Sequence, residues 1–164
     1  MLSCCLGGKT VIVVLQRVSR ASVSVGSECV GRIAEGLVAL AAIEEGDSER
    51  EAQWCARKVA EARLFPDADD KMNLSVGDAG GAILAVSQFT LVGDLQRGSR
   101  PSFSRAARPE SARPLFDRFV EGIRGAGLRV ETGVFQAMMQ LELVNDGPVT
   151  VILRKNPGGW NSEE

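Results

Sequence analysis

The sequence contains no histidine and no tyrosine among its 164 residues. Without histidine, catalytic mechanisms of the Ser-His-Asp and Cys-His types are excluded, and so are zinc sites with histidine ligands. Proton transfer in any reaction must therefore come from Asp, Glu, Lys, Cys, a chain terminus, water or the substrate itself.

Cysteine is also scarce, with four residues at positions 4, 5, 29 and 55. No two of them have Cys-x-x-Cys spacing, so they indicate neither a disulfide framework nor a cysteine-only metal site. The pattern is typical of reduced thiols in a cytosolic protein. The longest apolar run, Leu37–Ile43, is far shorter than the ~20 residues of a membrane-spanning helix. We expect a cytoplasmic protein without membrane contact, metal or other cofactor.

The charges are unevenly distributed along the chain. With 19 basic and 21 acidic residues, the net charge of −2 does not indicate nucleic-acid binding. From Arg97 to Arg129, however, eight arginines and three acidic residues give +5, and the remainder carries −7. These are either solvated surface charges or contacts to an RNA backbone, because a guanidinium can bind two phosphate oxygens. For the second case we select Arg97, Arg100 and Arg105.

Hydrophobic patterning indicates an α+β fold in one domain. Apolar, β-branched segments predict strands at residues 10–18, 21–25, 28–33, 37–43, 82–91, 128–131, 138–144 and 149–153. One helix is expected from Ser48, which forms a capping-box pattern with Glu51, to Arg63. A second begins at Pro109 and ends near Gly125. Since most strands follow one another in hairpin order, we predict a mostly antiparallel, barrel-like curled sheet with two inserted helices.

The predicted domain covers residues 9–153. Residues 1–8 are expected to form a disordered extension, and residues 154–164 a loose C-terminal tail. Residues 65–81 and 93–108 are rich in Gly, Asp, Ser or Arg, and they predict two long loops.

The segment Ser87–Leu91 places hydroxyl and amide side chains at the end of a predicted strand. A serine or threonine nucleophile needs a base, and no histidine is available to act as one. The polar face of an ordinary strand is the simpler interpretation of this alternation.

The segment Asn145–Pro148 has the composition of a tight hairpin turn, because Asp-Gly is a strong hairpin signal. A proline directly after it is less usual, since proline cannot donate to a sheet ladder. Were the Gly147-Pro148 bond cis, which is not the default, the carbonyls of Gly147 and Pro148 would be redirected together. Turned outward, two rigid acceptors could form a selectivity element made only of main chain.

These two segments, SQFTL at 87–91 and NDGPVT at 145–150, resemble the paired signature motifs of D-aminoacyl-tRNA deacylases. Further resemblance is found in QRVSRASV at 16–23, RPSFS at 100–104, GVF at 133–135 and Met139-Gln140, so that it covers nearly the whole domain. Gln136 stands where the family has a small residue.

The resemblance implies a homodimer whose active site is shared between subunits, with aminoacyl-tRNA rather than DNA as the other partner. It implies hydrolysis of the ester between a D-amino acid and the terminal adenosine of tRNA, with glycyl-tRNA on a non-cognate tRNA as a further substrate. The ribose 2′-hydroxyl would assist the reaction, although Thr90 as nucleophile stays open as an alternative.

The resemblance also implies roles for individual residues. The Gly147-Pro148 bond would be cis, and this pair would reject L-amino acids by a built-in clash. The catalytic segment would consist of Ser87, Gln88, Phe89 and Thr90. Pocket support would come from Arg17, Phe135, Met139 and Asn145.

Three other functions are compatible with the residues. One is a non-catalytic RNA-binding module that uses the arginine segment alone. Another is a synthetase-type editing domain of the same fold that removes a mischarged L-amino acid. A serine- or threonine-dependent esterase is the third, and the lack of histidine argues against it.

Overall fold

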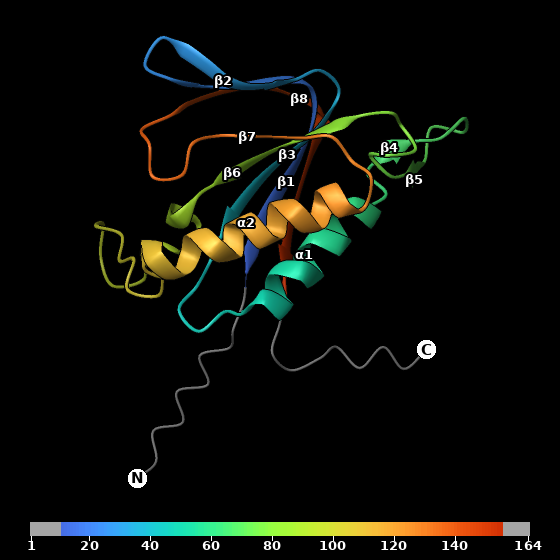
Figure 1. Ribbon diagram of the computed structural model, residues 1–164. Helices are drawn as coiled ribbons and strands as arrows, with labels where there is room; N and C mark the ends of the chain where they lie inside the picture. The colour runs from blue at the N-terminus through green and yellow to red at the C-terminus, as the bar shows by residue number, and fades with distance from the viewer. Residues whose placement is uncertain (1–10, 156–164) are drawn as a thin grey trace, which may run out of the picture.

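The computed structural model describes residues 11–155 (Figure 1). The predicted extension at 1–8 and residues 156–164 of the predicted tail lie outside this part. The elements are β1 (Ile12–Val25), β2 (Glu28–Ile33), β3 (Gly36–Ala42), α1 (Glu49–Glu61), β4 (Phe65–Pro66), β5 (Met72–Leu74), β6 (Ala82–Ser87), the 3-10 turn η1 (Phe89–Val92), α2 (Pro109–Gly125), β7 (Val130–Thr132) and β8 (Gln140–Arg154). Strand β8 therefore runs one residue into the predicted tail.

One sheet has the strand order β2-β1-β3-β6-β7, and β8 is added to β1. Strand β1 is antiparallel to β2, β3 and β8, whereas the pairs β3–β6 and β6–β7 are parallel. The prediction of a mostly antiparallel sheet is thus only partly right, because the sheet is mixed. The helices explain the difference: α1 returns the chain between β3 and β6, and α2 between β6 and β7, so each crossover starts the next strand in the same direction.

The sheet curls until β2 and β7, the two ends of its main path, lie side by side. Strand β1 pairs with β3 through residues 12–18 and with β2 through residues 21–25, which bends the sheet along its longest strand. A Cβ on Gly31 of β2 would lie 2.8 Å from the backbone oxygen of Thr132 in β7. The guanidinium of Arg129 also donates to the carbonyl of Arg32 at 3.5 Å. The predicted barrel-like closure is therefore present, and it is nearly complete.

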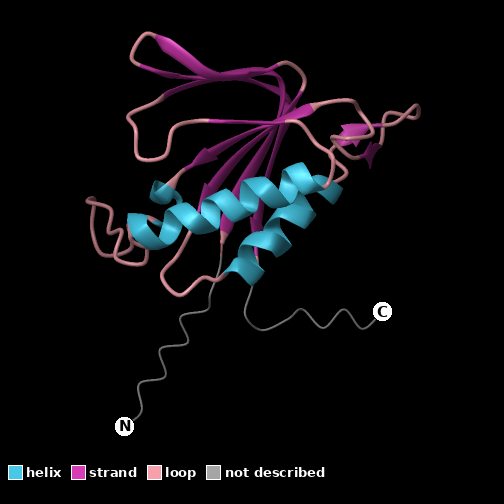
Figure 2. Cartoon of the chain, viewed as in Figure 1, coloured by secondary structure: helices cyan, strands magenta, loops and turns pink. Residues whose placement is uncertain are grey.

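Both helices cover one face of the sheet, as Figure 2 shows. Alternate residues of β3 divide the core: Leu37 and Ala39 face the helices, and Val38 faces the inside of the curled sheet. The helix side is filled by the fully buried Cys55, Phe119 and other apolar residues. None of the helices in residues 11–155 is long and apolar enough to cross a membrane.

The helix starts follow the predicted local chemistry. Ser48 caps α1, and the Glu51 carboxylate accepts the Ser48 backbone amide at 2.9 Å, so the predicted capping box is confirmed. Burial of this carboxylate raises its pKa, but the hydrogen bonds from the Ser48 hydroxyl and amides outweigh burial and lower the pKa overall. Pro109 occupies the first turn of α2, as predicted.

Strands β1 and β8 are each continuous, where the sequence predicted two strands apiece. Both halves of β8 pair antiparallel with β1, through residues 140–145 and 150–154, so the chain does not reverse between them. The predicted hairpin at Asn145–Pro148 is therefore wrong. The four residues after Asn145, up to position 149, leave the ladder, and the chain then returns to the same partner strand.

Two further differences concern loops. The predicted strand at 82–91 ends at Ser87, which pairs with Ala41 of β3 as the last pair of this ladder. The next residue, Gln88, still donates its amide to the Ala41 carbonyl at 2.8 Å. The chain then turns into η1. Within the predicted loop at 65–81, β4 and β5 form a small ribbon, whose turn is held by the Asp67 carboxylate through backbone amides of residues 69 and 71.

Candidate active site

A cleft of about 640 Å3 opens at the carboxyl ends of the parallel strands. Ligand sites of mixed and parallel sheets commonly lie at this edge, where successive loops leave the sheet. The cleft is lined by the ends of β3 and β6, by η1, by the start of α2 and by the segment between β7 and β8. These residues are Ala42, Ile43, Val86, Ser87, Gln88, Phe89, Thr90, Ala107, Pro109, Ala112, Phe135, Gln136, Ala137, Met138, Met139 and Leu141.

One wall of the cleft is the turn from β6 into η1. The Gln88 side-chain amide donates a hydrogen bond to the hydroxyl oxygen of Thr90. The ring of Phe89, 56% exposed, packs edge to face against Phe103 with 5.2 Å between the ring centroids. Phe103 thereby fixes the turn from outside the cleft, while Thr90 faces a hydrogen-bond donor rather than a base.

The opposite wall is the segment between β7 and β8. Phe135 is anchored against Phe116 of α2, with 6.2 Å between centroids. The sulfur of Met139 accepts the Val134 amide at 3.4 Å. Gln136 lies at the left-handed φ of 65°, a conformation that non-glycine residues adopt rarely. The side chain of Gln136 lines the cleft.

Every residue that lines this cleft in the described chain is uncharged. The polar groups are hydroxyls and amides, which donate and accept hydrogen bonds but do not take up protons at neutral pH. The lining can therefore hold a substrate and polarise a carbonyl by hydrogen bonding. Acid-base chemistry has to be supplied by another part of the reacting complex.

A bulge in β8 carries the second motif. Between the β1–β8 pairs Val18–Asn145 and Gln16–Thr150, strand β1 has one residue, Arg17, and β8 has four. We refer to these four residues, 146–149, as the β8 bulge. Its Gly147-Pro148 peptide bond is cis, and both residues are exposed. Gly147 has φ 129°, and a Cβ there would lie 2.8 Å from the Val149 side chain, so this position requires glycine.

Arg17 fills the space beneath the bulge and is only 12% exposed. Its Nε donates to the Asp146 carbonyl at 3.1 Å and lies 3.4 Å from the Asp146 carboxylate. Its Nη1 donates to the carbonyl of Leu64 at 2.8 Å. Arg17 therefore ties the bulge to the segment after α1, and its contact within the bulge is to Asp146.

The structure brings together some of the predicted site residues and separates others. Ser87, Gln88, Phe89, Thr90, Phe135 and Met139 line the cleft. Gly147, Pro148, Arg17 and Asn145 do not line it, and they form a second group around the β8 bulge.

The predicted RNA contacts lie in the loop between η1 and α2. Arg97 and Arg100 are exposed. Arg105 is 61% exposed and lies 3.5 Å from the Glu44 carboxylate, which is itself almost completely buried. Backbone hydrogen bonds from Glu45 to the Arg105 carbonyl at 2.8 Å and from Ala107 to the Ile43 carbonyl at 3.0 Å fasten the same end of the loop beside the cleft.

Three residues of this region were not singled out from the sequence. Phe103 supports Phe89, and its place in the RPSFS segment is the one sequence signal for it. Ala112 lines the cleft from α2, where its small size leaves room, but alanine in a helix carries no such signal. Glu44 anchors Arg105 and is visible only as a charged residue after an apolar strand.

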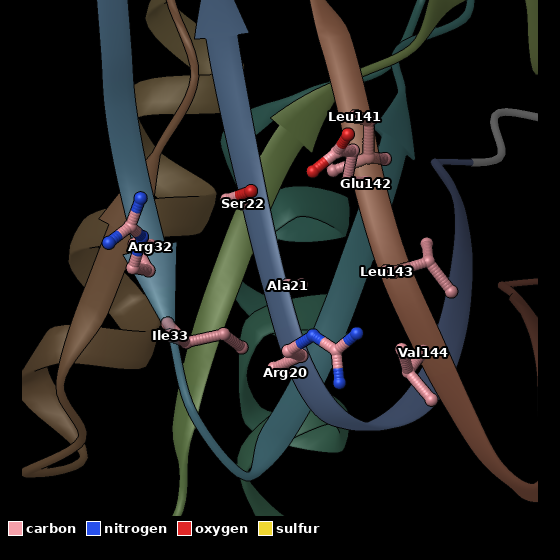
Figure 3. Close-up of a pocket in the computed structure, with 9 residues that line it drawn as sticks. All are labelled: Arg20, Ala21, Ser22, Arg32, Ile33, Leu141, Glu142, Leu143 and Val144. Atoms are coloured by element: carbon pink, nitrogen blue, oxygen red, sulfur yellow. The ribbon is translucent and has the colours of Figure 1, made fainter.

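A second hollow, of about 570 Å3, lies over β1, β2 and β8 (Figure 3). Arg20, Arg32 and Glu142 line it together with apolar residues of the three strands. None of the predicted site residues belongs to its lining, so the candidate active site is the cleft beside η1.

Comparison with known proteins identifies the family. The sequence model of the D-Tyr-tRNA(Tyr) deacylase family matches residues 14–154. The chain belongs to this family. A relative in Koribacter versatilis, named D-aminoacyl-tRNA deacylase, is 59% identical over 140 residues, which make up 85% of this chain and 94% of the relative.

Two solved structures share the deacylase fold. One, described as a c-Myc DNA unwinding element binding protein, has 38% identity and a TM-score of 0.82, and the match covers 90% of this chain and 99% of that chain. The other, described as a probable eukaryotic D-amino acid tRNA deacylase, has a TM-score of 0.79 at 19% identity and covers 89% of this chain and all of that one. The family match thus extends across the cleft and the β8 bulge alike.

Proposed function

We propose that this protein hydrolyses the ester between a D-amino acid and the 3′-terminal adenosine of tRNA, and that glycyl-tRNA on a non-cognate tRNA is a further substrate. The observation that carries the proposal is the turn Ser87–Thr90, which lines an uncharged cleft in a chain of the deacylase family. The products are the free amino acid and a tRNA with a free 3′-hydroxyl. The cytoplasm, where tRNA is charged, is the proposed location.

The uncharged lining supports a substrate-assisted reaction. In the proposed mechanism, water attacks the ester carbonyl, and the ribose 2′-hydroxyl relays the proton to the departing 3′-oxygen. The proposal assigns stabilisation of the developing oxyanion to the backbone amides of Phe89 and Thr90, which lie at the start of η1. One such donor contributes about 3 kcal/mol to catalysis. Positioning of the attacking water and the ribose 2′-hydroxyl contributes several kcal/mol more.

The β8 bulge is proposed to act in the cleft of a second subunit. It does not line the cleft of its own chain, and its residues 146–148 are exposed. Apolar side chains at the cleft and along β8 are exposed as well, with Met138 at 90% and Val144 at 39%, which favours a homodimer that covers them. In that dimer the carbonyls of Gly147 and Pro148 would occupy the space that an L side chain needs.

A clash of this kind suits the task better than an apolar pocket. A pocket discriminates one methylene by only about 1–3 kcal/mol, and the two mirror-image amino acids have identical groups. Rejection of one handedness through rigid main-chain atoms leaves the remaining space open to side chains of different size.

The proposal is tested by single-turnover hydrolysis of one tRNA charged with D-tyrosine, with L-tyrosine or with glycine. We expect rapid hydrolysis of the D-ester and the glycyl ester, and slow hydrolysis of the L-ester. Equal rates for the two mirror images would refute the proposed selectivity. Turnover confined to the L-ester would support a synthetase-type editing domain, and binding without turnover an RNA-binding module.

The mechanism has a separate test. A tRNA that ends in 2′-deoxyadenosine and carries its amino acid at the 3′ position lacks the assisting hydroxyl. We expect it to bind normally and to be hydrolysed at least about 100-fold more slowly, since general acid-base assistance contributes on the order of 10²-fold or more. Normal turnover of this substrate would exclude substrate assistance and leave the proposed substrate class intact.

A further inference from the structure

Three polar side chains close the base of the β8 bulge. Asn145 precedes the bulge, Thr150 follows it, and Gln16 lies opposite in β1. The Asn145 Oδ1 accepts the backbone amide of Val149 at 2.8 Å, and the Asn145 Nδ2 donates to the Thr150 hydroxyl oxygen at 3.0 Å. The same oxygen accepts a hydrogen bond from Gln16 Nε2 at 3.3 Å. We call these three residues the amide clamp.

The amide clamp and Arg17 hold opposite ends of the bulge. Arg17 bonds to Asp146, the first bulge residue, whereas the clamp bonds to Val149, the last one. Gly147 and Pro148 lie between the two attachments and are exposed to solvent. The position of this pair is therefore set from both sides, by two sets of contacts that share no side chain.

We propose that Thr150 is a positioning residue for chiral selection. Its hydroxyl oxygen orients the Asn145 amide, and that amide holds the Val149 end of the bulge. This inference rests on the proposed function of Gly147 and Pro148 as the selective element. A clash rejects an L side chain only while the clashing atoms cannot yield, and a displacement of about 1 Å is enough to undo precise placement at a reacting centre.

The clamp affects selectivity more than turnover of the correct substrate. A D side chain points away from the bulge in the proposed arrangement, so loosening of Val149 leaves the reacting groups at Ser87–Thr90 in place. Loosening admits the L-ester instead. Removal of the Thr150 hydroxyl deletes the acceptor of two hydrogen bonds. Each bond shifts the equilibrium between the held and the released Val149 end of the bulge by a factor of roughly five.

The experiment compares Thr150→Val, which keeps the shape and removes the hydroxyl, with Thr150→Ser, which keeps the hydroxyl. Both are made in the full-length protein. We expect Thr150→Val to hydrolyse L-tyrosyl-tRNA roughly tenfold faster than the wild type, with the rate on D-tyrosyl-tRNA changed by less than threefold. Thr150→Ser is expected to keep the wild-type ratio of the two rates.

A second readout does not depend on catalysis. Because the Val149 amide is bonded to the clamp, its hydrogen exchange should be roughly tenfold faster in Thr150→Val and unchanged in Thr150→Ser. Amides in the α2 core serve as the internal reference, since a general loss of stability would accelerate both. If Thr150→Val does not fold, Gln16→Leu, which removes only the longer of the two bonds, should show the same changes at smaller size.

The outcomes separate this inference from the proposed function. If the wild type does not distinguish the two mirror images, the proposed function fails, whatever the variants do. If the wild type is selective and folded Thr150→Val is equally selective, with unchanged exchange at Val149, the role of Thr150 is overturned and the proposed function stands.

Discussion

At the scale of single residues, Thr90 is the side chain whose chemistry is most constrained by its neighbours. Its hydroxyl oxygen accepts a hydrogen bond from the side-chain amide of Gln88, and the cleft lining around it is uncharged. A nucleophilic threonine needs a group that accepts its proton. The geometry therefore favours a positioning role for Thr90 over covalent catalysis.

This arrangement predicts that Thr90→Ala retains deacylation within about tenfold of the wild type, the range of one lost hydrogen bond in the site. Single-turnover rates on D-tyrosyl-tRNA measure it, with Thr90→Ser as the matched control that keeps the hydroxyl. A loss of roughly a thousandfold in Thr90→Ala alone, with tRNA binding intact, would instead identify Thr90 as the nucleophile.

Cys55 provides a prediction on pH and stability. Burial, and next the charge of Asp47, raise the pKa of its thiol to about 12. The unfolded chain ionises this thiol near pH 8.5, so the stability that Cys55 contributes is complete below that pH and falls as the pH rises toward 12. We expect the free energy of unfolding to decrease by about 1.4 kcal/mol per pH unit above pH 9 through this group.

Urea unfolding of the wild type and Cys55→Ala at pH 8 and pH 10 measures this effect. The variant should lose less stability between the two pH values than the wild type does. Alkylation at pH 8 is an independent check, because Cys29 is exposed and Cys55 is buried. Equal labelling of Cys29 and Cys55 in the folded protein would contradict the assignment.

At this scale the sequence identifies residues whose chemistry is local. The capping box at Ser48 depends on neighbours three positions apart, so spacing was sufficient to predict it. The partner of Arg105 could not be predicted, because Glu44 lies about sixty positions earlier and meets it only through the fold. Phe103 was missed as a support of Phe89 for the same reason.

At the scale of elements, the packing of α1 on α2 depends on one glycine. A Cβ on Gly122 would lie 2.7 Å from the Cβ of Ala56 on the facing helix. Gly125 lies in the same helix, and a Cβ added there would have no neighbouring atom within 4 Å. The two glycines therefore share helical context and differ in their contacts.

We predict that Gly122→Ala destabilises the fold and that Gly125→Ala does not. Alanine gains up to about 1 kcal/mol of helix propensity at either site. At Gly122 the overpacking cost of about 1–3 kcal/mol exceeds this gain. Thermal unfolding at equal protein concentration should show a lower Tm for Gly122→Ala and an equal or higher Tm for Gly125→Ala, and an unchanged Tm for both would refute the close contact.

The elements also show where local signals mislead. Asn145–Pro148 has the composition of a hairpin turn, yet the strands on both sides pair with β1. The composition of this segment predicts that the chain leaves the β-sheet pairing. It does not predict with which strand the chain pairs afterwards. The parallel pairs β3–β6 and β6–β7 followed from strand-helix-strand order, which outweighs the hairpin order of the first strands.

At the scale of the whole molecule, the separation of the cleft from the β8 bulge has a testable consequence. Ala112→Phe blocks the cleft of a subunit and leaves its bulge intact, whereas Gly147→Ala disturbs the bulge and leaves the cleft open. In a mixed form of the proposed homodimer, the open cleft of one subunit would receive the intact bulge of the other. Only subunit exchange can produce this combination.

We predict that excess Ala112→Phe protein, mixed and re-associated with Gly147→Ala protein, reduces L-ester hydrolysis by the latter toward the wild-type level. Single-turnover rates on the D- and L-esters measure the change, and Gly147→Ala mixed with itself is the control. Unchanged L-ester hydrolysis in verified mixed dimers would mean that each bulge serves its own subunit.

The arginine segment gives a prediction about tRNA affinity. If the exposed Arg97 and Arg100 contact phosphates, reversing both charges to Glu weakens tRNA binding and lowers the slope of log affinity against log salt by about two. Reversal of Arg50 and Arg57 on α1 changes the net charge equally and is the matched control. If both double reversals weaken tRNA binding equally, Arg97 and Arg100 act only through the net charge of the protein and do not contact phosphates.

The β8 bulge also affects how the molecule behaves in a crowded solution. Among the described strands, β8 pairs only with β1, so its other edge carries unused hydrogen-bonding groups beside the exposed Val151 and Ile152. Such an edge can recruit foreign strands and seed fibrils. The four bulge residues interrupt β8 in its middle. An added strand could therefore pair with only two short stretches of this edge. The bulge that carries the proposed selective pair thus also shortens the strand edge that is open to another chain.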